Sequence, residues 1–371
     1  MRTDRENFNR FSGQTVDDPF EGIDPNKEFH FESGVFVPND PPGVYPVFNM
    51  AHYEGILLSV HFFTDEWNRM EGSAVMVAPG IAFAATHVIE PHIPHVMDIA
   101  RRMLCIGYTS SGPRFWRVRQ FEKVNGTDLI ILSLQYASAL PAENRFKQAA
   151  LTTRLPGIGE QVMIAGLRAS NEHASADDQM NFAVKDGTNS YGADVRIGVG
   201  EVTEHYLGGR GSMLPGLVIE VACSTPGGLS GGPAFDKNGR VFGILSTSFN
   251  HEDGRGPSYV SGLVPGLVLP IRPGFFTFPQ EPERIRLIES EACSIDRRDV
   301  IRWSIIDNGM TRLEYDDYTW CRLLPDGRQQ CGRLFAFRDS VPSTSRDPHV
   351  PTLINPTSID LFGLRVALLF R

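Results

Sequence analysis

Short apolar runs separated by turn residues are the feature of this 371-residue sequence that most restricts its fold. Each run has the length of one β-strand, and glycine, proline, Asn-Gly or Asp-Gly residues follow many of them. The 36 Gly and 26 Pro residues are typical of many short strands and turns rather than of long helices. We predict strands at residues 55–63, 73–80, 81–85, 115–121, 129–134, 161–166, 195–202, 217–222 and 241–246. This pattern predicts an all-β barrel or sandwich.

Charge and apolar content exclude several classes of protein. Lys and Arg number 35 against 44 Asp and Glu, a net charge of −9, which argues against a nucleic-acid binder with a basic face. No apolar run approaches the ~18 residues that cross a bilayer, and the charged start of the chain does not resemble a signal peptide. Five widely spaced cysteines are an odd set and a poor disulfide framework. We therefore expect a cytoplasmic protein without a membrane partner.

The two ends of the chain differ from its centre. Residues 1–52 lack a sustained period and predict an arm that lies over a core or is partly disordered. Residues 273–371 predict a separate, smaller mixed appendage, with room for a helix in 279–303 and an apolar last strand in 361–371. A short helix is also expected at 94–102.

Within the appendage, residues 315–337 predict a hairpin about Pro325-Asp326-Gly327. Cys321 and Cys331 lie symmetrically about this turn and are expected to face each other. Two buried thiols that pack as small apolar groups are the favoured interpretation, and a disulfide is the other.

Three segments carry residues that could take part in catalysis, and they follow one another in the order His, Asp, Ser. Ala84-Ala85-Thr86-His87 ends an apolar run, Asp128 opens another, and Gly228-Leu229-Ser230-Gly231-Gly232-Pro233 forms a glycine-rich turn. A serine hydroxyl needs a base to become a nucleophile, and the carbonyl that it attacks needs N–H donors for the developing oxyanion. Glycines around the serine allow the amides of Gly228 and Ser230 to point into one such oxyanion hole.

Other interpretations of these segments fit less well. Gly228-Leu-Ser-Gly-Gly232 also matches the nucleophile elbow of α/β-hydrolases, but that motif needs a following helix and a later histidine in triad order. His87, His92 and His95 lie near Glu90 and Asp98, yet two prolines interrupt any helix that would align them on a metal. We therefore expect no metal site.

The three segments resemble the trypsin/chymotrypsin-like serine peptidase family, over about residues 53–272. The resemblance implies two antiparallel β-barrels, at about residues 53–150 and 151–272, with the active site between them. It implies Ser230 as the nucleophile, His87 as the general base and acid, and Asp128 as the group that orients His87. It also implies an oxyanion hole formed by the amides of Gly228 and Ser230.

Departures from the family pattern refine this expectation. Leu229 replaces the aspartate with which zymogen-activated members bind a newly cut N-terminus, and Val88 replaces a cysteine of the family's disulfide. Ser224 stands where an acid would select basic substrates, so a small or medium apolar residue is expected before the cleaved bond. Ser246 matches a serine that supports the buried aspartate and contacts the substrate backbone, and Ser248 is expected to line the same pocket.

The sequence therefore predicts a serine endopeptidase that acts through an acyl-enzyme on Ser230 and needs no cofactor. Its partners are expected to be a protein or peptide substrate and a regulatory protein that binds the appendage. Two alternatives stay open: a catalytically silent protease fold used as a binding scaffold, and an esterase without peptidase activity.

Overall fold

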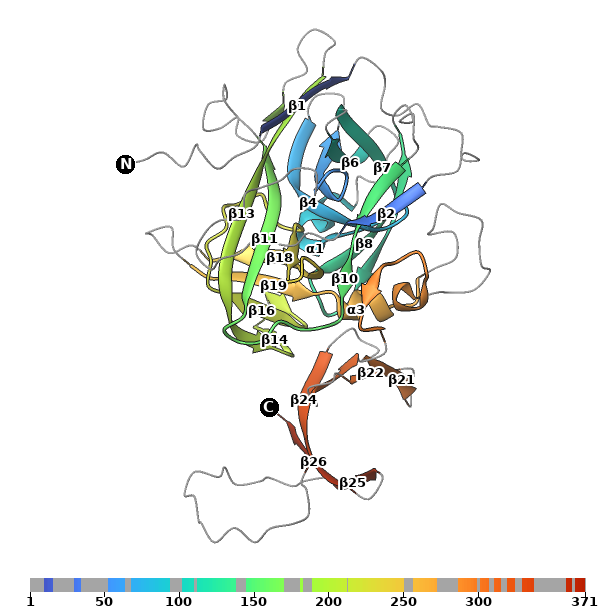
Figure 1. Ribbon diagram of the computed structural model, residues 1–371, viewed down its shortest axis with the longest axis vertical. Coiled ribbons are helices and arrows are strands. Elements are labelled where there is room, and N and C mark those ends of the chain that lie inside the picture. Colours follow the sequence, from blue (N-terminus) through green and yellow to red (C-terminus); the bar gives the residue numbers. More distant parts are fainter. Residues whose placement is uncertain are drawn as a thin grey trace.

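The computed structural model describes residues 10–15, 30–34, 53–63, 68–93, 102–109, 112–137, 145–169, 181–182, 189–211, 213–249, 256–271, 286–298, 301–306, 310–314, 319–323, 329–336, 358–361 and 364–370. Nearly all regular structure in these residues is β-strand (Figure 1). The helices among them are α1 (Thr86–Ile89), α3 (Val264–Val268) and the 3₁₀ turns η3 (Glu90–His92) and η5 (Leu287–Glu289). The all-β prediction is confirmed.

Six strands form a first closed antiparallel barrel, in the order β4-β3-β6-β7-β8-β5 with β5 returning to pair with β4. They are β3 (Leu57–Phe63), β4 (Asn68–Ala78), β5 (Ile81–Ala85), β6 (Arg102–Thr109), β7 (Gly112–Val124) and β8 (Leu129–Tyr136). The two-residue strand β12 (Asn181–Phe182) adds to β4. Of the helix predicted at 94–102, Arg102 begins β6, and residues 94–101 lie outside the described residues.

A second closed antiparallel barrel follows, in the order β17-β11-β13-β16-β19-β18 with β18 returning to pair with β17. Its strands are β11 (Gln161–Ala169), β13 (Asn189–Tyr206), β16 (Val218–Val221), β17 (Pro233–Phe235), β18 (Val241–Ser248) and β19 (Ser258–Gly262). The short pair β14 (Gly209–Arg210) and β15 (Leu214–Pro215) lies between β13 and β16 in the chain. Closure leaves no long sheet edge in either barrel.

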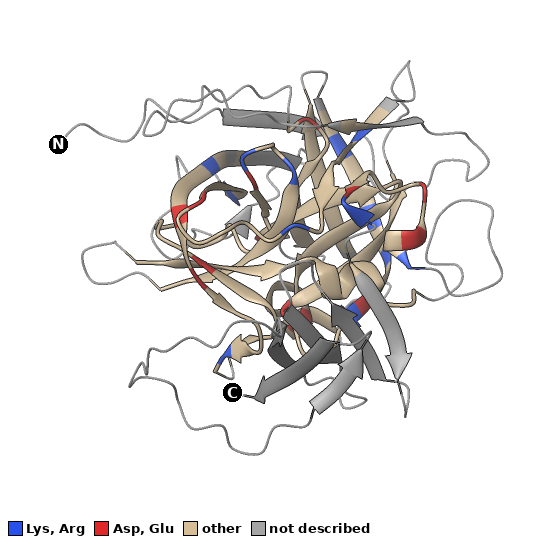
Figure 2. Cartoon of the chain, turned by 60° about the horizontal axis from the view of Figure 1, so that its bottom comes forward, with Lys and Arg blue, Asp and Glu red and all other residues tan. Residues whose placement is uncertain are grey.

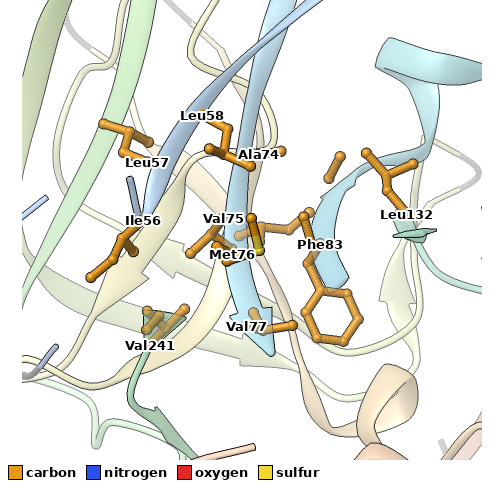
Figure 3. Packing of buried hydrophobic residues seen from close by; sticks show 14 of the residues in the cluster. Ile56, Leu57, Leu58, Ala74, Val75, Met76, Val77, Phe83, Leu132 and Val241 are labelled. Carbon is orange, nitrogen blue, oxygen red and sulfur yellow. The ribbon is translucent and has the colours of Figure 1, made fainter. Parts of the chain in front are cut away.

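The two barrels share one apolar core. In Figure 3, Val241 of β18 lies in the same cluster as Val77 of β4 and Ile56. The ring of Tyr53 meets that of Phe235 edge-on at 5.8 Å between centroids, so a residue that precedes the first barrel packs on the second. Because this core crosses the junction, burial of apolar surface opposes separation of the barrels.

Two short stretches of the predicted N-terminal arm form strands, one on the sheet of the second barrel and one in a separate two-stranded sheet. Strand β1 (Arg10–Thr15) pairs antiparallel with β13, and β2 (His30–Gly34) pairs in parallel with β9 (Arg145–Ala149). Each of these two stretches therefore pairs with a strand of the main body, and the rest of residues 1–52 lies outside the described residues, so the two expectations for the arm stay predictions.

Residues 286–298 pack on the barrels rather than apart from them. Strand β20 (Ile295–Asp296) pairs in parallel with β10 (Leu151–Thr152), and the amide of Gln148 donates to the carbonyl of Ala292 at 2.7 Å. The only helical element described in the region where we expected a helix is the 3₁₀ turn η5. The division at residue 272 stays a prediction, but this packing places 286–298 with the barrels.

The described strands beyond residue 301 form a separate sheet, in the order β21-β22-β23-β24-β26-β25. They are β21 (Arg302–Ile306), β22 (Met310–Glu314), β23 (Thr319–Leu323), β24 (Gln329–Ala336), β25 (Ser358–Leu361) and β26 (Leu364–Phe370). The hairpin prediction is confirmed, because β23 pairs with β24 and places Cys321 directly opposite Cys331. The apolar C-terminal strand β26 pairs with β24 and β25.

Candidate active site

Pairing of β5 with β8 brings His87 and Asp128 to the same edge of the first barrel. The two strands are antiparallel, and Ala85 at the end of β5 lies opposite Leu129 at the start of β8. The amide of Thr86 donates to the carbonyl of Asp128 at 3.0 Å, which ties the two chain segments together beyond the strands. Positions 41 residues apart in the sequence therefore become neighbours.

A tight turn presents Asp128 at the start of β8. Asn125-Gly126 forms the turn, with Gly126 at φ +72°, where glycine carries no steric penalty. The Thr127 hydroxyl donates to the carbonyl of Val124 at 2.6 Å and accepts from the amide of Leu129 at 3.0 Å. These bonds fix the backbone on both sides of the aspartate.

Asp128 is 6 % exposed and accepts three hydrogen bonds. The amide of His87 donates to Oδ1 at 3.0 Å, the Nδ1 atom of His87 lies 2.8 Å from Oδ2, and the Ser246 hydroxyl donates to Oδ2 at 2.5 Å. Charge-assisted bonds of this kind contribute about 1.5–3 kcal/mol each. Since Oδ2 accepts at Nδ1, the proton of a neutral imidazole resides there, and Nε2 is left as the basic nitrogen.

Ser230 lies on a glycine-rich loop that fits between the two barrels. Leu229 is fully buried, and a Cβ on Gly166 of β11 would lie 2.7 Å from its side chain. A Cβ on Gly231 would lie 2.0 Å from the carbonyl oxygen of Ser73 and 3.0 Å from the amide of Ala85. The loop thus approaches Ser73 of β4 at a distance that only glycine permits, and it also lies beside Ala85, the last residue of β5.

The Ser230 hydroxyl donates to the backbone carbonyl of Ser246 at 3.0 Å. Ser246 therefore links the nucleophile candidate to Asp128, through its carbonyl on one side and its hydroxyl on the other. Within the described residues, no hydrogen bond joins the Ser230 hydroxyl to His87. A catalytic triad requires the Ser230 hydroxyl to donate to His87 instead.

The two amides predicted for the oxyanion hole lie on the same loop. Gly228 has φ +93°, and a Cβ there would meet only the Cγ of Arg168, at 3.7 Å. The backbone conformation, rather than lack of space, therefore favours glycine at this position. In the described part of the chain, neither the Gly228 amide nor the Ser230 amide donates to another protein group.

The predicted substrate-side serines lie on two segments that touch each other. Ser224 is exposed on the segment between β16 and Ser230, and the Ser248 hydroxyl donates to the carbonyl of Thr225 at 2.8 Å. Deeper in the second barrel, the Thr225 and Ser258 hydroxyls lie 2.8 Å apart. Residues 223–229 and 246–249 contain no acidic side chain. The lack of preference for basic substrates stays a prediction.

The described cysteines are poor candidates for the nucleophile. Burial raises the thiol pKa of Cys223 to about 11 and that of Cys293 to about 12, and it also raises the pKa of Cys105. Few of these thiols are therefore ionised at neutral pH. The described residues contain no group of three metal-ligating side chains, and His95 and Asp98 lie outside them.

Two closed six-stranded antiparallel barrels with these segments at their junction define the chymotrypsin-like fold, the fold of the trypsin-like serine proteases. The resemblance predicted this fold, and the strand order confirms it. The roles of the individual site residues stay predictions, although the structure brings His87, Asp128, Ser246 and Ser230 together.

Comparisons with known proteins found solved structures with a similar fold, but no family model and no curated protein that matches the sequence. A solved structure of the Rv3671c protease from M. tuberculosis in its active form is 14% identical over 64% of this chain and 88% of that one, with a TM-score of 0.37. Deg5 is 13% identical over 58% and 86% of the two chains, with a TM-score of 0.38. The HtrA-type protease AlgW with a decapeptide is 14% identical over 57% and 62%, with a TM-score of 0.37.

Proposed function

We propose that this protein is a serine endopeptidase that forms an acyl-enzyme on Ser230. The observation that carries the proposal is the hydrogen-bonded series His87–Asp128–Ser246–Ser230, which spans the two barrels. A base, the carboxylate that orients it and a serine on a glycine-rich loop are the groups that acyl transfer needs.

In the proposed reaction, Ser230 loses its proton to Nε2 of His87 as its Oγ attacks the peptide carbonyl. The amides of Gly228 and Ser230 stabilise the oxyanion, and Asp128 stabilises the imidazolium. The imidazolium then protonates the leaving amine, which departs as the acyl-enzyme forms. Water, with His87 again as base, hydrolyses the ester and restores Ser230.

Substrate binding supplies a route from the observed serine orientation to the reactive one. Ser230 now donates to the carbonyl of Ser246, the residue that we expect to contact the substrate backbone. A substrate N–H that donates to this carbonyl would compete with the Ser230 hydroxyl and leave it free to donate to His87. The proposal therefore requires the Ser230 hydroxyl to exchange the carbonyl of Ser246 for His87 as its hydrogen-bond acceptor.

The orientation of the Ser230 hydroxyl also favours a second candidate function, a catalytically silent protease fold that serves as a binding scaffold. In such a protein the bond from Ser230 to Ser246 would persist when a ligand binds. An esterase without peptidase activity would share the acyl-enzyme and differ only in its substrates.

A serine-directed fluorophosphonate probe tests the proposal. We expect covalent labelling of the wild-type protein at Ser230, lost in Ser230→Ala, because only an activated hydroxyl attacks phosphorus at a measurable rate. Absence of labelling in both proteins, with and without peptide ligands, would favour the scaffold. Comparison of ester with peptide substrates separates the esterase, and a proteome-wide cleavage profile of wild type against Ser230→Ala identifies the residue preferred before the cleaved bond.

We propose in addition that the protein acts in the cytoplasm on protein or peptide substrates, without a nucleic-acid or membrane partner. Acidic and basic residues both occur along the described elements in the view of Figure 2, and the net charge is −9. In the part of the chain that the structure describes, no helix has the length and apolar character to cross a membrane. Cell fractionation tests the location directly.

We also propose that the C-terminal sheet restrains the peptidase or binds a regulatory protein. A deletion should begin after Ile301, because Leu287, Ile288, Cys293 and Ile301 belong to the main core. We expect the shortened protein to fold, to cleave peptides faster and to lose the regulatory partner. Peptide-cleavage rates and affinity capture with the full chain as reference measure this, and unchanged results in both assays would refute the role.

A further inference from the structure

Ser73 of β4 joins the first barrel to the second directly beside the nucleophile candidate. Its amide donates to the carbonyl of Ser230 at 2.8 Å. Its hydroxyl accepts from the amide of Leu167 at 2.8 Å and lies 3.3 Å from the carbonyl of the same residue, to which it donates. Leu167 belongs to β11, and Ser73 is fully buried. One residue of the first barrel therefore holds both the nucleophile loop and the strand behind that loop.

Two local features of β4 bring Ser73 to this position. Opposite β3, Val60 pairs with Gly72 and His61 with Met70, so Glu71 is the extra residue of a β-bulge. A bulge bends its strand and re-aims the residues that follow. At Gly72 a Cβ would lie 2.8 Å from the carbonyl oxygen of Ser230 and 3.0 Å from the side chain of Val88. The bend and the missing side chain allow this close approach.

The site needs such a connection because its groups come from different barrels. His87 and Asp128 belong to the first barrel, whereas Ser230 lies on a loop of the second. The distance between base and nucleophile therefore depends on how the barrels are placed. The bond from Ser246 to Asp128 fixes this placement on one side of the reacting pair, and the bonds of Ser73 fix it through the nucleophile's own main chain.

We propose that Ser73 is a positioning residue for the reaction at Ser230. Its hydroxyl fixes β4 on β11, and its amide then holds the carbonyl of Ser230, so that the nucleophile loop keeps its place relative to His87. Ser73 acts through the backbone of Ser230 and not on the reacting atoms. This inference rests on the proposed hydrolytic function.

The variant Ser73→Ala tests the role of the hydroxyl. It leaves the amide and the carbonyl of Leu167 without their buried partner, so β4 and β11 are free to shift. We expect the rate constant of fluorophosphonate labelling to fall at least about tenfold, because small misplacements of reacting groups lower rates strongly. With a peptide substrate, kcat should fall and KM should change little. Ser73→Thr keeps the hydroxyl and should restore most of the rate.

Ser59→Ala is the matched control. Ser59 lies directly opposite Ser73 across β3 and β4 and is equally buried, but its hydroxyl contacts Ile106, Tyr108 and His61, which all belong to the first barrel. We expect a similar loss of stability and a labelling rate within about twofold of wild type. Equal rate losses in the two variants would overturn the positioning role.

Hydrogen exchange gives a measurement that does not depend on activity. In Ser73→Ala, we expect amides in residues 163–169 and 226–233 to exchange at least about tenfold faster than in wild type, and in Ser59→Ala to stay protected. Unchanged exchange in both segments of Ser73→Ala would overturn the proposal. If the wild-type protein is not labelled by the probe, the proposed function fails, and the exchange result alone decides whether Ser73 fixes the loop.

Discussion

His87→Ala is expected to lower the rate of fluorophosphonate labelling by about 10⁴-fold or more, while the protein keeps its fold. The variant removes the Nε2 base, so the Ser230 hydroxyl has to attack with its proton in place. His87 has a side chain that is 48% exposed, which means that its loss leaves no large cavity in the core. Labelling rates measured under single-turnover conditions, with circular dichroism as a check on folding, give the comparison.

Two further variants make this result specific. Asp128→Asn should also lower the rate by several orders of magnitude, because an amide in place of the carboxylate favours the wrong imidazole tautomer. His92→Ala is the matched control, since His92 lies five residues further along, stacks on Phe62 and pairs with Glu71 at 3.3 Å. Its labelling rate should stay within a few fold of wild type. A rate for His87→Ala that equals that of His92→Ala would remove His87 from the reaction.

Gly231→Ala is expected to destabilise the protein by about 3 kcal/mol or more. The new methyl group would lie 2.0 Å from the carbonyl oxygen of Ser73, and the residue has φ +86°. The left-handed backbone costs an alanine about 1–2 kcal/mol, and the forced shift of two packed backbone segments adds about 1–3 kcal/mol. The free energy of unfolding in urea measures the loss, and covalent labelling at Ser230 should fall with it.

Gly159→Ala separates the two contributions. Gly159 has φ +81°, close to that of Gly231, but no atom lies within 4 Å of the position that its Cβ would occupy. This variant should therefore show the backbone cost alone, about 1–2 kcal/mol. If the two variants lost the same stability, the contact between Gly231 and Ser73 would have no energetic consequence, and the close packing of the loop would be refuted.

Much of the barrel architecture was predictable from the apolar runs. Each of the nine runs predicted as strands contains or overlaps a strand, and residues 81–85 match the bounds of β5. The structure extends others, because neighbouring strands continue the hydrogen bonding past the apolar run. Strand β13 spans 18 residues where eight were predicted.

The strands that we did not predict form mainly through their partners. Pro233–Phe235 and Leu151–Thr152 are too short to show a period, yet they pair with β18. Arg10–Thr15 and His30–Gly34 lie in a segment without apolar alternation. The first extends the sheet of the second barrel, and the second forms a two-stranded sheet with β9. A strand of this kind depends on a partner elsewhere in the chain, which local propensity does not contain.

The active site, like the fold, was predictable from the sequence only in part. The sequence indicated the chemistry of His87, Asp128 and Ser230, and the family resemblance added Ser246. The sequence did not indicate that Ser73 would bind the carbonyl of Ser230, because Gly72-Ser73 has the pattern of an ordinary strand. Nor did it show that the Ser230 hydroxyl would donate to the carbonyl of Ser246.

By itself, the sequence determined the kind of protein: an all-β chain with strand-length apolar runs, and a serine framed by glycines that follows a histidine and an aspartate. Only the tertiary structure decided how the pieces meet, including the packing of residues 286–298 on the barrels and the place of Ser73 under the nucleophile loop. The physical reason is that residue type and local period act over a few neighbours along the chain. Contacts such as Ser73 with Leu167, 94 positions apart, exist only once two closed barrels have packed together.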